Sequence, residues 1–410
     1  MFRITARTVL ELGSELISSD IIAFYELIKN GFDARTKAGV DVKFDIVLTR
    51  RAFLRLKDTI HGEASLPDLK KLIKNELLPT ASESAYTGFI ALIDEATTKQ
   101  KLTEKLDQAQ RRFNTITVTD TGSGMSLEDL DRSFLVIGTP SRKKEVEAAL
   151  ARGDKRTPYL GEKGIGRLSA MRLGERLLVE TARSTDKKLN RLEIDWTEFS
   201  NVDAMLDQIA VTPTKGGKKP SAEWSGTALM ISDLVENWTE ARVRDMADYE
   251  FARLTDPFAN ATTRPRVAIF WNGERIGIPI MSGALLDAAH ARVSGTYELI
   301  NGAPVLTCTF EALDLGFEHP RERQTVKLTE EDLQATIIGK DGPVEDSALC
   351  TIGPFSFEAH WYNRRRLGAI DTIGEQKAVR ELQQKWSGIL LFRDRFRVFP
   401  YGEDEDDWLE

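Results

Sequence analysis

The stretch that decides the fold is IIAFYELIKNGFDA, residues 21–34. Its apolar residues recur at helical spacing, and Glu26, Asn30 and Asp33 stand at positions i, i+4 and i+7. Side chains at these spacings share one face of an α-helix. Acidic and amide side chains are seldom placed together among apolar neighbours without a partner. We therefore expect a helix that presents two carboxylates and one carboxamide to a ligand.

Composition and charge are those of an ordinary globular protein. The chain has 410 residues, of which 41% are hydrophobic and 29% are charged, and it is long enough for two or three cores. Its net charge is −8, and the segment GEDEDDWLE at residues 402–410 contains six acidic residues. The remainder is almost balanced, so overall charge gives no reason to expect nucleic acid. This acidic ending predicts that the chain is a fragment of a longer protein.

Cysteine usage and hydropathy exclude two further classes. Cys308 and Cys350 lie far apart and have no neighbouring ligand pattern, which argues against a structural zinc site and fits a reducing compartment. No segment approaches the ~18 consecutive apolar residues that a membrane span requires. We expect a soluble cytoplasmic protein without a membrane partner.

The segment between the first helix and the next motif predicts a strand and an insertion. Residues 42–48, VKFDIVL, alternate between apolar and polar side chains, as a half-buried strand does. Residues 64–113 are rich in helix-forming and charged residues at helical period, with an interruption at Pro79. This pattern predicts two inserted surface helices.

A second motif joins a strand to a glycine turn. The strand pattern ITVTD at residues 116–120 runs directly into TGSGM at residues 121–125. A strand that ends in Asp120, followed by two glycines, forms a pocket floor with one fixed acceptor, because glycine allows close backbone approach. The exocyclic amine of adenine is a suitable donor for that acceptor. A simple Asp-Thr-Gly turn is the alternative interpretation.

A third motif is rich in glycine. Residues 161–167, GEKGIGR, precede a helix-forming run, and glycine amides at a helix N-terminus bind phosphate. A P-loop would require Lys-Ser or Lys-Thr after the last glycine, and a dinucleotide fingerprint would require glycine where Ser169 stands. Both classes are excluded. Further on, Thr227 in the Gly-Thr pair at residues 226–227 places a hydroxyl at the mouth of another strand.

In this order the motifs resemble those of the GHKL ATPases. This superfamily contains DNA gyrase, the ninety-kilodalton heat-shock chaperone, sensor histidine kinases, MutL and MORC proteins. The resemblance is carried by four sequences: ELIKNGFDA at 26–34, DTGSGM at 120–125, GEKGIG at 161–166 and GT at 226–227. The long interval between Asn30 and Asp120 departs from the family pattern, and we assign it to the helical insertion.

The resemblance implies an α+β fold with two domains. Residues 1–235 would form a Bergerat-type α/β sandwich that binds ATP, with the helical insertion at 64–113 and a mobile lid at 139–160. Residues 236–410 alternate between strand and helix patterns and would form a transducer-like mixed α/β domain.

The resemblance also implies roles for individual residues. Glu26 would be the general base toward the attacking water, and Asn30 would coordinate Mg²⁺. The remaining contacts to the nucleotide would come from Asp33, Ala34, Asp120, Gly122, Gly124, Met125, Thr139, Gly161, Lys163, Gly164, Ile165, Gly166, Arg167 and Thr227. In such proteins a transducer cation reaches the γ-phosphate, and Lys327 and Lys377 are the candidates. An ordinary solvated role is the alternative for both lysines and for Lys163.

ATP and Mg²⁺ are thus the implied cofactors, and an ATP-gated homodimer is the implied assembly. It would act as a clamp or chaperone on a macromolecular client, with protein and DNA both open. One alternative is a nucleotide-binding signalling module with little turnover. Another is a phosphotransferase of the sensor-kinase type, which the position of all four histidines after Glu26 disfavours. The segment FRDRFRVFPYG at residues 392–402 resembles bacterial MORC-like or chaperone-like members and suggests a defence or stress role.

Overall fold

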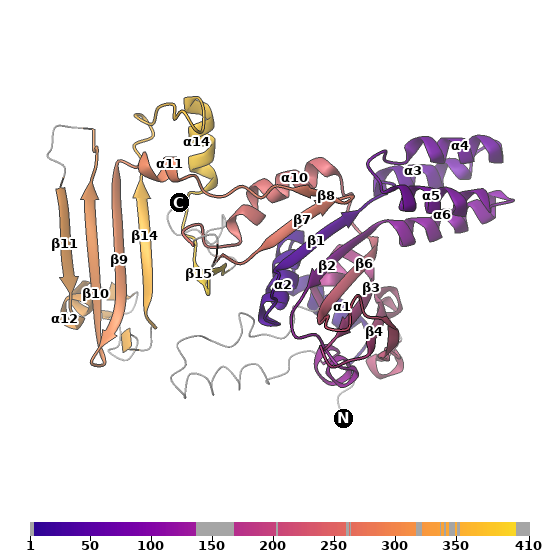
Figure 1. Cartoon of the computed structure of the whole chain (residues 1–410), viewed down its shortest axis with the longest axis horizontal. Helices are drawn as coiled ribbons and strands as arrows, with labels where there is room; N and C mark the ends of the chain where they lie inside the picture. Colours follow the sequence, from indigo (N-terminus) through magenta and orange to yellow (C-terminus); the bar gives the residue numbers. More distant parts are fainter. Residues whose placement is uncertain are drawn as a thin grey trace. The chain divides into compact units, whose positions relative to one another are not determined.

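The computed structural model describes residues 4–136, 168–201, 204–259, 262, 264–316, 322–336, 338–339, 342–343, 349–350 and 353–398. The chain divides into two compact units (Figure 1). The first comprises Met1–Pro279 together with Gly388–Glu410, and the second comprises Ile280–Ser387.

A mixed eight-stranded sheet forms the centre of the first unit. Its strands follow the order β5-β4-β3-β6-β2-β1-β7-β8. Strands β1 and β7 pair in parallel, and every other neighbouring pair in this sheet is antiparallel. The strands are β1 Val40–Asp45, β2 Thr115–Asp120, β3 Gly174–Ala182, β4 Lys188–Asp195, β5 Thr214–Lys218, β6 Gly226–Leu234, β7 Val267–Trp271 and β8 Glu274–Ile276.

Helices cover one face of this sheet. On β1 the side chains of Val40, Val42 and Phe44 are buried, whereas that of Lys43 is exposed. This alternation is typical of a sheet with one face against a core. The packed helices are α1 Arg7–Leu16, α2 Asp20–Asp33, α9 Ser169–Leu173 and α10 Glu240–Tyr249. The predicted α/β sandwich is therefore confirmed.

Helix α2 occupies the centre of this layer, beside β1 and β2 (Figure 1). It begins after Ser19, whose extended backbone has φ −142° and whose side-chain oxygen accepts a hydrogen bond from the Ile22 amide at 3.3 Å. Phe24 is fully buried, and its ring centre lies 5.6 Å from that of Phe44 and 5.8 Å from that of Phe251. Burial of one such side chain contributes roughly 2 kcal/mol.

Shorter helical turns complete the first unit. They are α7 Leu127–Asp129, the π-helical turn Leu130–Phe134, and the 3₁₀ turns Trp196–Ser200, Leu206–Gln208 and Phe251–Arg253. Ser126 and Asp129 form a reciprocal capping box at the start of α7, as their spacing indicates.

The helical insertion is larger than predicted. Four helices replace the two that we expected: α3 Arg50–Ile60, α4 Leu66–Glu76, α5 Glu83–Asp94 and α6 Lys99–Phe113. Each begins at a hydroxyl N-cap, namely Thr49, Ser65, Ser82 and Thr98. The four N-caps mark four helix starts, whereas Pro79 marks only one interruption of the helical pattern.

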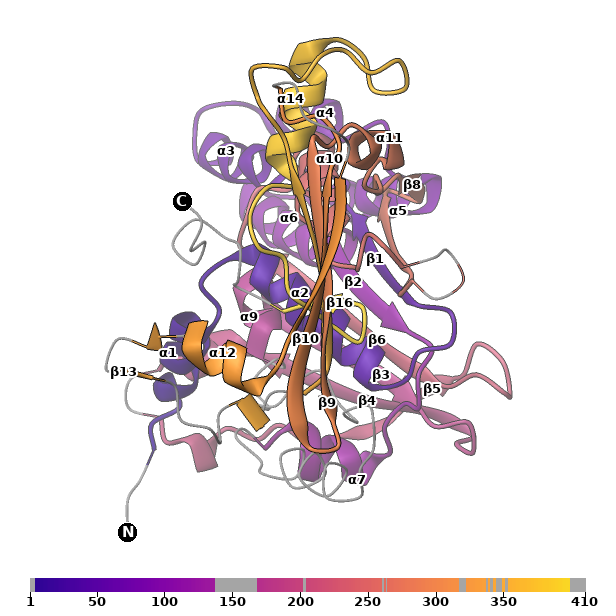
Figure 2. The same ribbon diagram turned by 90° about the vertical axis from the view of Figure 1, so that its left-hand side faces the viewer.

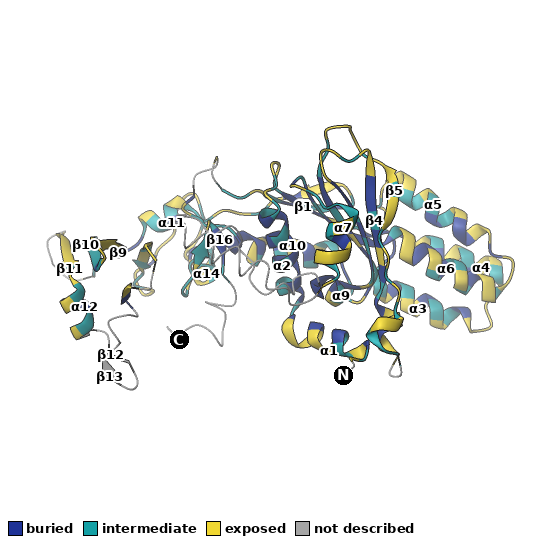
Figure 3. Cartoon of the chain, turned by 90° about the horizontal axis from the view of Figure 1, so that it is seen from below, coloured by how far each residue is buried: buried dark blue, intermediate teal, exposed yellow. Residues whose placement is uncertain are grey.

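This four-helix subdomain has a core of its own. Leu56 of α3, Ile73 of α4, Phe89 of α5 and Leu106 of α6 are among its buried residues. Exposed and half-buried residues cover the outside of the four helices (Figure 3). The subdomain is therefore a separate packing unit attached to the ends of β1 and β2.

The second unit contains a four-stranded antiparallel sheet in the order β11-β10-β9-β14 (Figures 1 and 2). The strands are β9 Ala291–Ile300, β10 Ala303–Ala312, β11 Glu322–Leu328 and β14 Phe355–Trp361, with a small ladder of β12 Ile338–Gly339 and β13 Gly342–Pro343. Its helices are α11 Gly283–Asp287, α12 Glu330–Thr336 and α14 Gln376–Lys385. The predicted mixed α/β second domain is confirmed. None of the described helices combines the length and apolar character needed to cross a membrane.

The two compact units divide the chain at positions other than residue 235. Val267 of β7 pairs with Val40 of β1, which adds residues 267–276 to the first sheet. Within residues 388–398, β15 Phe392–Arg393 and β16 Phe396–Arg397 form a hairpin that belongs to the first unit. Pairing between segments so distant in sequence leaves no mark in local composition.

Asn114 ties the helical subdomain to the sheet. It is 1% exposed, and its Oδ1 accepts hydrogen bonds from the amides of Val47 and Leu48 at 2.8 and 2.9 Å. Its Nδ2 donates to Gln110. Replacing this side chain leaves two buried N–H groups without their acceptor.

We predict that Asn114→Ala destabilises the subdomain by about 3 kcal/mol, because each unsatisfied buried amide costs about 1–3 kcal/mol. The matched control is Asn237→Ala, since Asn237 accepts a hydrogen bond from the exposed Arg51 amide, and its loss should cost less than about 1 kcal/mol. Hydrogen exchange across α3 and α6 measures both effects. Equal protection in the two variants would contradict the prediction.

Candidate functional site

The C-terminal half of α2 approaches the end of β2 because residue 31 is glycine. A Cβ atom at Gly31 would lie 2.6 Å from Cγ2 of Val40 and 3.2 Å from Cβ of Asp120. No larger residue fits there without displacing the helix. The structure therefore brings together the ELIKNGFDA and DTGSGM motifs, which are far apart in sequence.

The residue after α2 closes onto the glycine turn. The Ala34 carbonyl accepts a hydrogen bond from the Ser123 amide at 2.8 Å. A Cβ atom at Gly122 would lie 2.4 Å from that carbonyl oxygen, so only glycine permits the contact. Asp33, the last residue of the helix, is 8% exposed. Thus Asp33, Ala34 and Gly122 lie at one junction, and their contacts to a nucleotide stay a prediction.

A row of polar side chains crosses the sheet at this junction. Thr181 of β3 pairs with Thr227 of β6, and Thr227 pairs with Asp120 of β2. Paired residues present their side chains on the same face of a sheet. The hydroxyl oxygens of Thr181 and Thr227 are 3.0 Å apart, and Thr181 also donates to the Gly226 carbonyl at 2.8 Å.

Asp120 is the most electrostatically perturbed group of this row. It is 8% exposed, and its Oδ1 accepts a hydrogen bond from the Gly122 amide at 2.7 Å. Burial raises the pKa of Asp120 from 3.8 to about 6, because the charged form loses its hydration. Hydrogen bonds from the backbone of Gly122 and Thr227 partly oppose the shift. Asp120 is therefore an acceptor at neutral pH and a donor in mild acid.

The rest of the turn is fixed by β3 and β4. Gly124 has φ +65°, and a Cβ atom there would lie 1.9 Å from the Ala182 carbonyl oxygen. The Met125 amide donates to the Thr181 hydroxyl at 2.9 Å, and the Met125 carbonyl accepts from Asn190 at 2.8 Å. Gly124 and Met125 are thus held beside β3 and β4.

Thr181 and Asn190 are site residues that the sequence interpretation missed. Both are fully buried. They lie on β3 and β4, for which we made no strand prediction. The alternation of Leu177, Val179 and Thr181 is the signal that indicates this strand.

Glu26 lies at the other end of the α2 face. Its side chain is 19% exposed and forms an ion pair with Lys29, whose side chain is 10% exposed. Lys29 Nζ also lies 5.0 Å from the centre of the Tyr25 ring. The sequence interpretation missed Lys29, although its position three residues after Glu26 predicts such contact.

Asn30 is half-buried, and within the described part of the chain its side chain has no hydrogen-bond partner. A carboxamide oxygen beside a carboxylate is a donor set that suits Mg²⁺. Magnesium sites completed by substrate phosphates need only one or two protein oxygens. The chemistry of Asn30 therefore fits the metal role that the resemblance implies.

The other residues predicted for the nucleotide site are either outside the described residues or in the second unit. Outside the described residues are Thr139, Gly161, Lys163, Gly164, Ile165, Gly166 and Arg167. The lid expected at 139–160 is also outside them. Lys327 on β11 and Lys377 on α14 belong to the second unit. Lys377 is 89% exposed with its Nζ 3.8 Å from Glu381, and the transducer role of both lysines stays a prediction.

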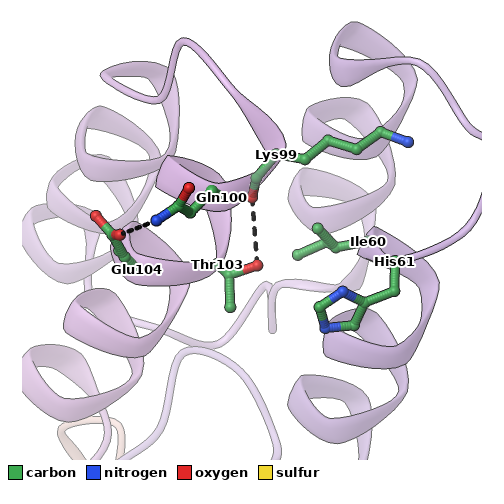
Figure 4. A pocket seen from close by; sticks show the side chains of 6 residues that line it. All are labelled: Ile60, His61, Lys99, Gln100, Thr103 and Glu104. Carbon is green, nitrogen blue, oxygen red and sulfur yellow. Dashed lines mark hydrogen bonds between the residues drawn. The ribbon is translucent and has the colours of Figure 1, made fainter.

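A separate pocket of about 380 Å³ lies between the end of α3 and the start of α6 (Figure 4). It is lined by Ile60, His61, Lys99, Gln100, Thr103 and Glu104. Gln100 donates to Glu104 and Thr103 to the Lys99 carbonyl within α6, and Lys99 Nζ donates to the Gly62 carbonyl at 2.6 Å just after α3. None of the residues predicted for the nucleotide site lines this pocket.

The raised pKa of Asp120 predicts a pH-dependent stability. A pKa that is higher in the folded state contributes stability below pH 3.8, and this contribution is lost as the pH rises through about 6. The free energy of unfolding of the parent, relative to Asp120→Asn, should therefore fall by about 1 kcal/mol between pH 5 and pH 8. Hydrogen exchange of β2 amides at several pH values measures the difference. A difference that does not vary with pH would contradict the assigned shift.

Comparison with known proteins supports one family. Residues 91–223 match the family model described as "Histidine kinase-, DNA gyrase B-, and HSP90-like ATPase". The matched range contains the Asp120 turn and the glycine segment, and it begins after α2. A search of curated protein sequences gave no match.

Among solved structures, the ATPase region of Saccharomyces cerevisiae topoisomerase II is similar with a TM-score of 0.26 and 15% identity. The alignment covers 48% of this chain and 49% of that chain, so this chain spans about half of the length of that relative. The family model covers about a third of the chain, so residues 91–223 are similar to that group of ATPases.

Proposed function

We propose that the first unit binds ATP with Mg²⁺ and hydrolyses it. One observation carries the proposal: the end of α2 and the Asp120 turn form a single junction, through Gly31, Ala34 and Gly122. A helix with a carboxylate and a carboxamide thereby adjoins a buried carboxylate at a strand end. The match to a GHKL-type ATPase domain supports the same assignment.

In this proposal Asp120 recognises the base. With a pKa of about 6, its carboxylate is mostly ionised at neutral pH, so it accepts a hydrogen bond from the exocyclic amine of adenine. The Gly122 amide holds one of its oxygens at 2.7 Å, which fixes the direction of the other. Thr227 lies directly beside it in the sheet. Because Asp120 is buried, a base that lacks a donor at this position would leave its carboxylate without that hydrogen bond, which is unfavourable.

Glu26 would act at the phosphate end. A carboxylate in this position orients the attacking water and takes its proton. Asn30 would hold Mg²⁺, which when bound offsets the negative charge of the phosphates. The helix fixes the separation of the two side chains at one turn. Hydrolysis by this arrangement depends on positioning more than on covalent chemistry.

The resemblance extends the proposal to an ATP-gated homodimer. Nucleotide would order the lid and close two N-terminal domains, and hydrolysis would open them. The cycle would drive a clamp or chaperone activity on a macromolecular client, with DNA and protein both open.

A second function has one observation in its favour. The ion pair between Lys29 and Glu26 withholds one carboxylate oxygen from water. A base restrained in that way suits a module that binds nucleotide and signals with little turnover.

We predict that Glu26→Gln lowers Mg²⁺-dependent ATP turnover by at least about a hundredfold, because general-base catalysis contributes about 10²–10⁴ in rate. Nucleotide affinity should change by less than about twofold, since the amide keeps the shape of the side chain. The matched control is Glu11→Gln on α1, where Glu11 forms an exposed ion pair with Arg7. Turnover and equilibrium nucleotide binding are measured on the same samples.

The outcomes separate the two functions. Turnover by Glu26→Gln at the parental rate would contradict the role of Glu26. Firm nucleotide binding without turnover in the parent would support the signalling module. Mass in solution with a non-hydrolysable ATP analogue tests dimerisation independently.

A further inference from the structure

Lys29 contacts both Glu26 and the ring of Tyr25, and all three residues lie on α2. Its Nζ donates a hydrogen bond to Oε1 of Glu26 and lies 5.0 Å from the centre of the Tyr25 ring. Lys29 is 8% exposed and Tyr25 is 7% exposed. A buried ammonium requires a partner charge and an electron-rich surface. Here both partners belong to α2, so the position of Tyr25 influences the position of Lys29.

Tyr25 is in turn held by the hairpin of β15 and β16. Its ring stacks on that of Phe396 with 5.2 Å between centres and 25° between planes. Its hydroxyl donates a hydrogen bond to the Arg397 carbonyl. Phe396 also contacts Phe32, with ring centres 5.4 Å apart. The hairpin therefore contacts α2 on both sides of Lys29 in the sequence.

The hairpin is itself firmly placed in the first unit. Asp394 and Arg395 have φ values of 49° and 68°, which is the backbone of a tight two-residue turn. The Arg397 amide donates to the Leu254 carbonyl at 2.9 Å, and the Arg395 carbonyl accepts from the Asp256 amide at 3.0 Å. Phe396 is 1% exposed. The contact with Tyr25 is therefore made by a buried, doubly anchored segment.

We propose that this hairpin positions the Glu26 carboxylate through Tyr25 and Lys29, and that residues 392–397 are consequently part of the hydrolysis machinery. The inference rests on the proposed function of Glu26. A carboxylate held at one oxygen loses rotamer freedom and keeps its second oxygen for water. Lys29 and Tyr25 are positioning residues in this scheme, and the hairpin sets both.

The first test changes Lys29. Lys29→Met should lower kcat by about tenfold and leave nucleotide affinity within about twofold, because a positioning residue acts on the reacting geometry. Lys29→Arg should recover much of the loss, since it restores the cation. The matched control is Lys57→Met: Lys57 bonds Asp107 at 2.8 Å and lies 5.3 Å from the centre of the Phe53 ring in the helical subdomain. This control should leave both quantities unchanged.

The second test changes one hydroxyl. Tyr25→Phe removes the hydrogen bond to Arg397 and keeps the ring, so kcat should fall by about two- to fivefold at constant affinity. Tyr297→Phe is the matched control in the second unit. Tyr297 stacks on Phe355 with 5.1 Å between ring centres and donates to the Leu349 carbonyl at 2.7 Å. This second hydroxyl should have no effect on turnover.

A third readout does not depend on turnover. Amine labelling followed by peptide mass spectrometry should show slow modification of Lys29 in the parent and rapid modification of Lys377, which is 89% exposed. Phe396→Leu should accelerate labelling of Lys29 and leave that of Lys377 unchanged, because it removes the stack that holds Tyr25.

The results distinguish this inference from the function on which it rests. If Glu26→Gln abolishes turnover and Lys29→Met retains the parental kcat, the positioning inference is overturned and the proposed function stands. A higher kcat in Lys29→Met would overturn it as well, since the lysine would then restrain the base. If Glu26→Gln hydrolysed ATP at the parental rate, the proposed role of Glu26 would itself be contradicted.

Discussion

The structure of the first unit depends on the close contact between α2 and β2 at Gly31. With 2.6 Å between a Cβ atom there and Val40, any side chain would lift the helix from the sheet. The contact sets the height of α2 above the sheet. Asp33 and Ala34 consequently reach the Asp120 turn, and Asn30 and Glu26 lie about one and two turns before Asp33 in the helix. A packing constraint at one residue thus determines the spacing of the chemical groups.

Buried Asp120 and half-buried Glu26 have different partners. Asp120 has backbone donors and no cation among its described contacts, so burial raises its pKa to about 6. Glu26 instead has the ammonium of Lys29 beside it. Loss of hydration causes the shift at Asp120, and the backbone hydrogen bonds only partly oppose it. The carboxyl group beside the end of α2 and the one in the middle of this helix thus have different electrostatic environments.

Local patterns predicted the α2 helix, the strand ending in Asp120 and the capping box at Ser126, because each depends on residues close together in sequence. They did not predict β3 and β4, and so missed Thr181 and Asn190, which matter only through pairing with β6 and the Met125 turn. The pairing of β7 with β1 was missed for the same reason, because the two strands are more than two hundred residues apart in sequence. The four hydroxyl N-caps of the helical insertion are local signals in the sequence, but the prediction of two helices relied on Pro79 alone.

The order of the two units along the chain determines which truncations keep the first unit whole. The second unit, Ile280–Ser387, is inserted between β8 and the hairpin that packs on α2. A chain cut after Pro279 would lose Phe396 and expose the aromatic surface of Tyr25 and Phe32. A chain that lacks only residues 280–387 would instead retain both segments of the first unit. The first unit is therefore discontinuous in sequence, because it is built from two segments that are separated by the second unit.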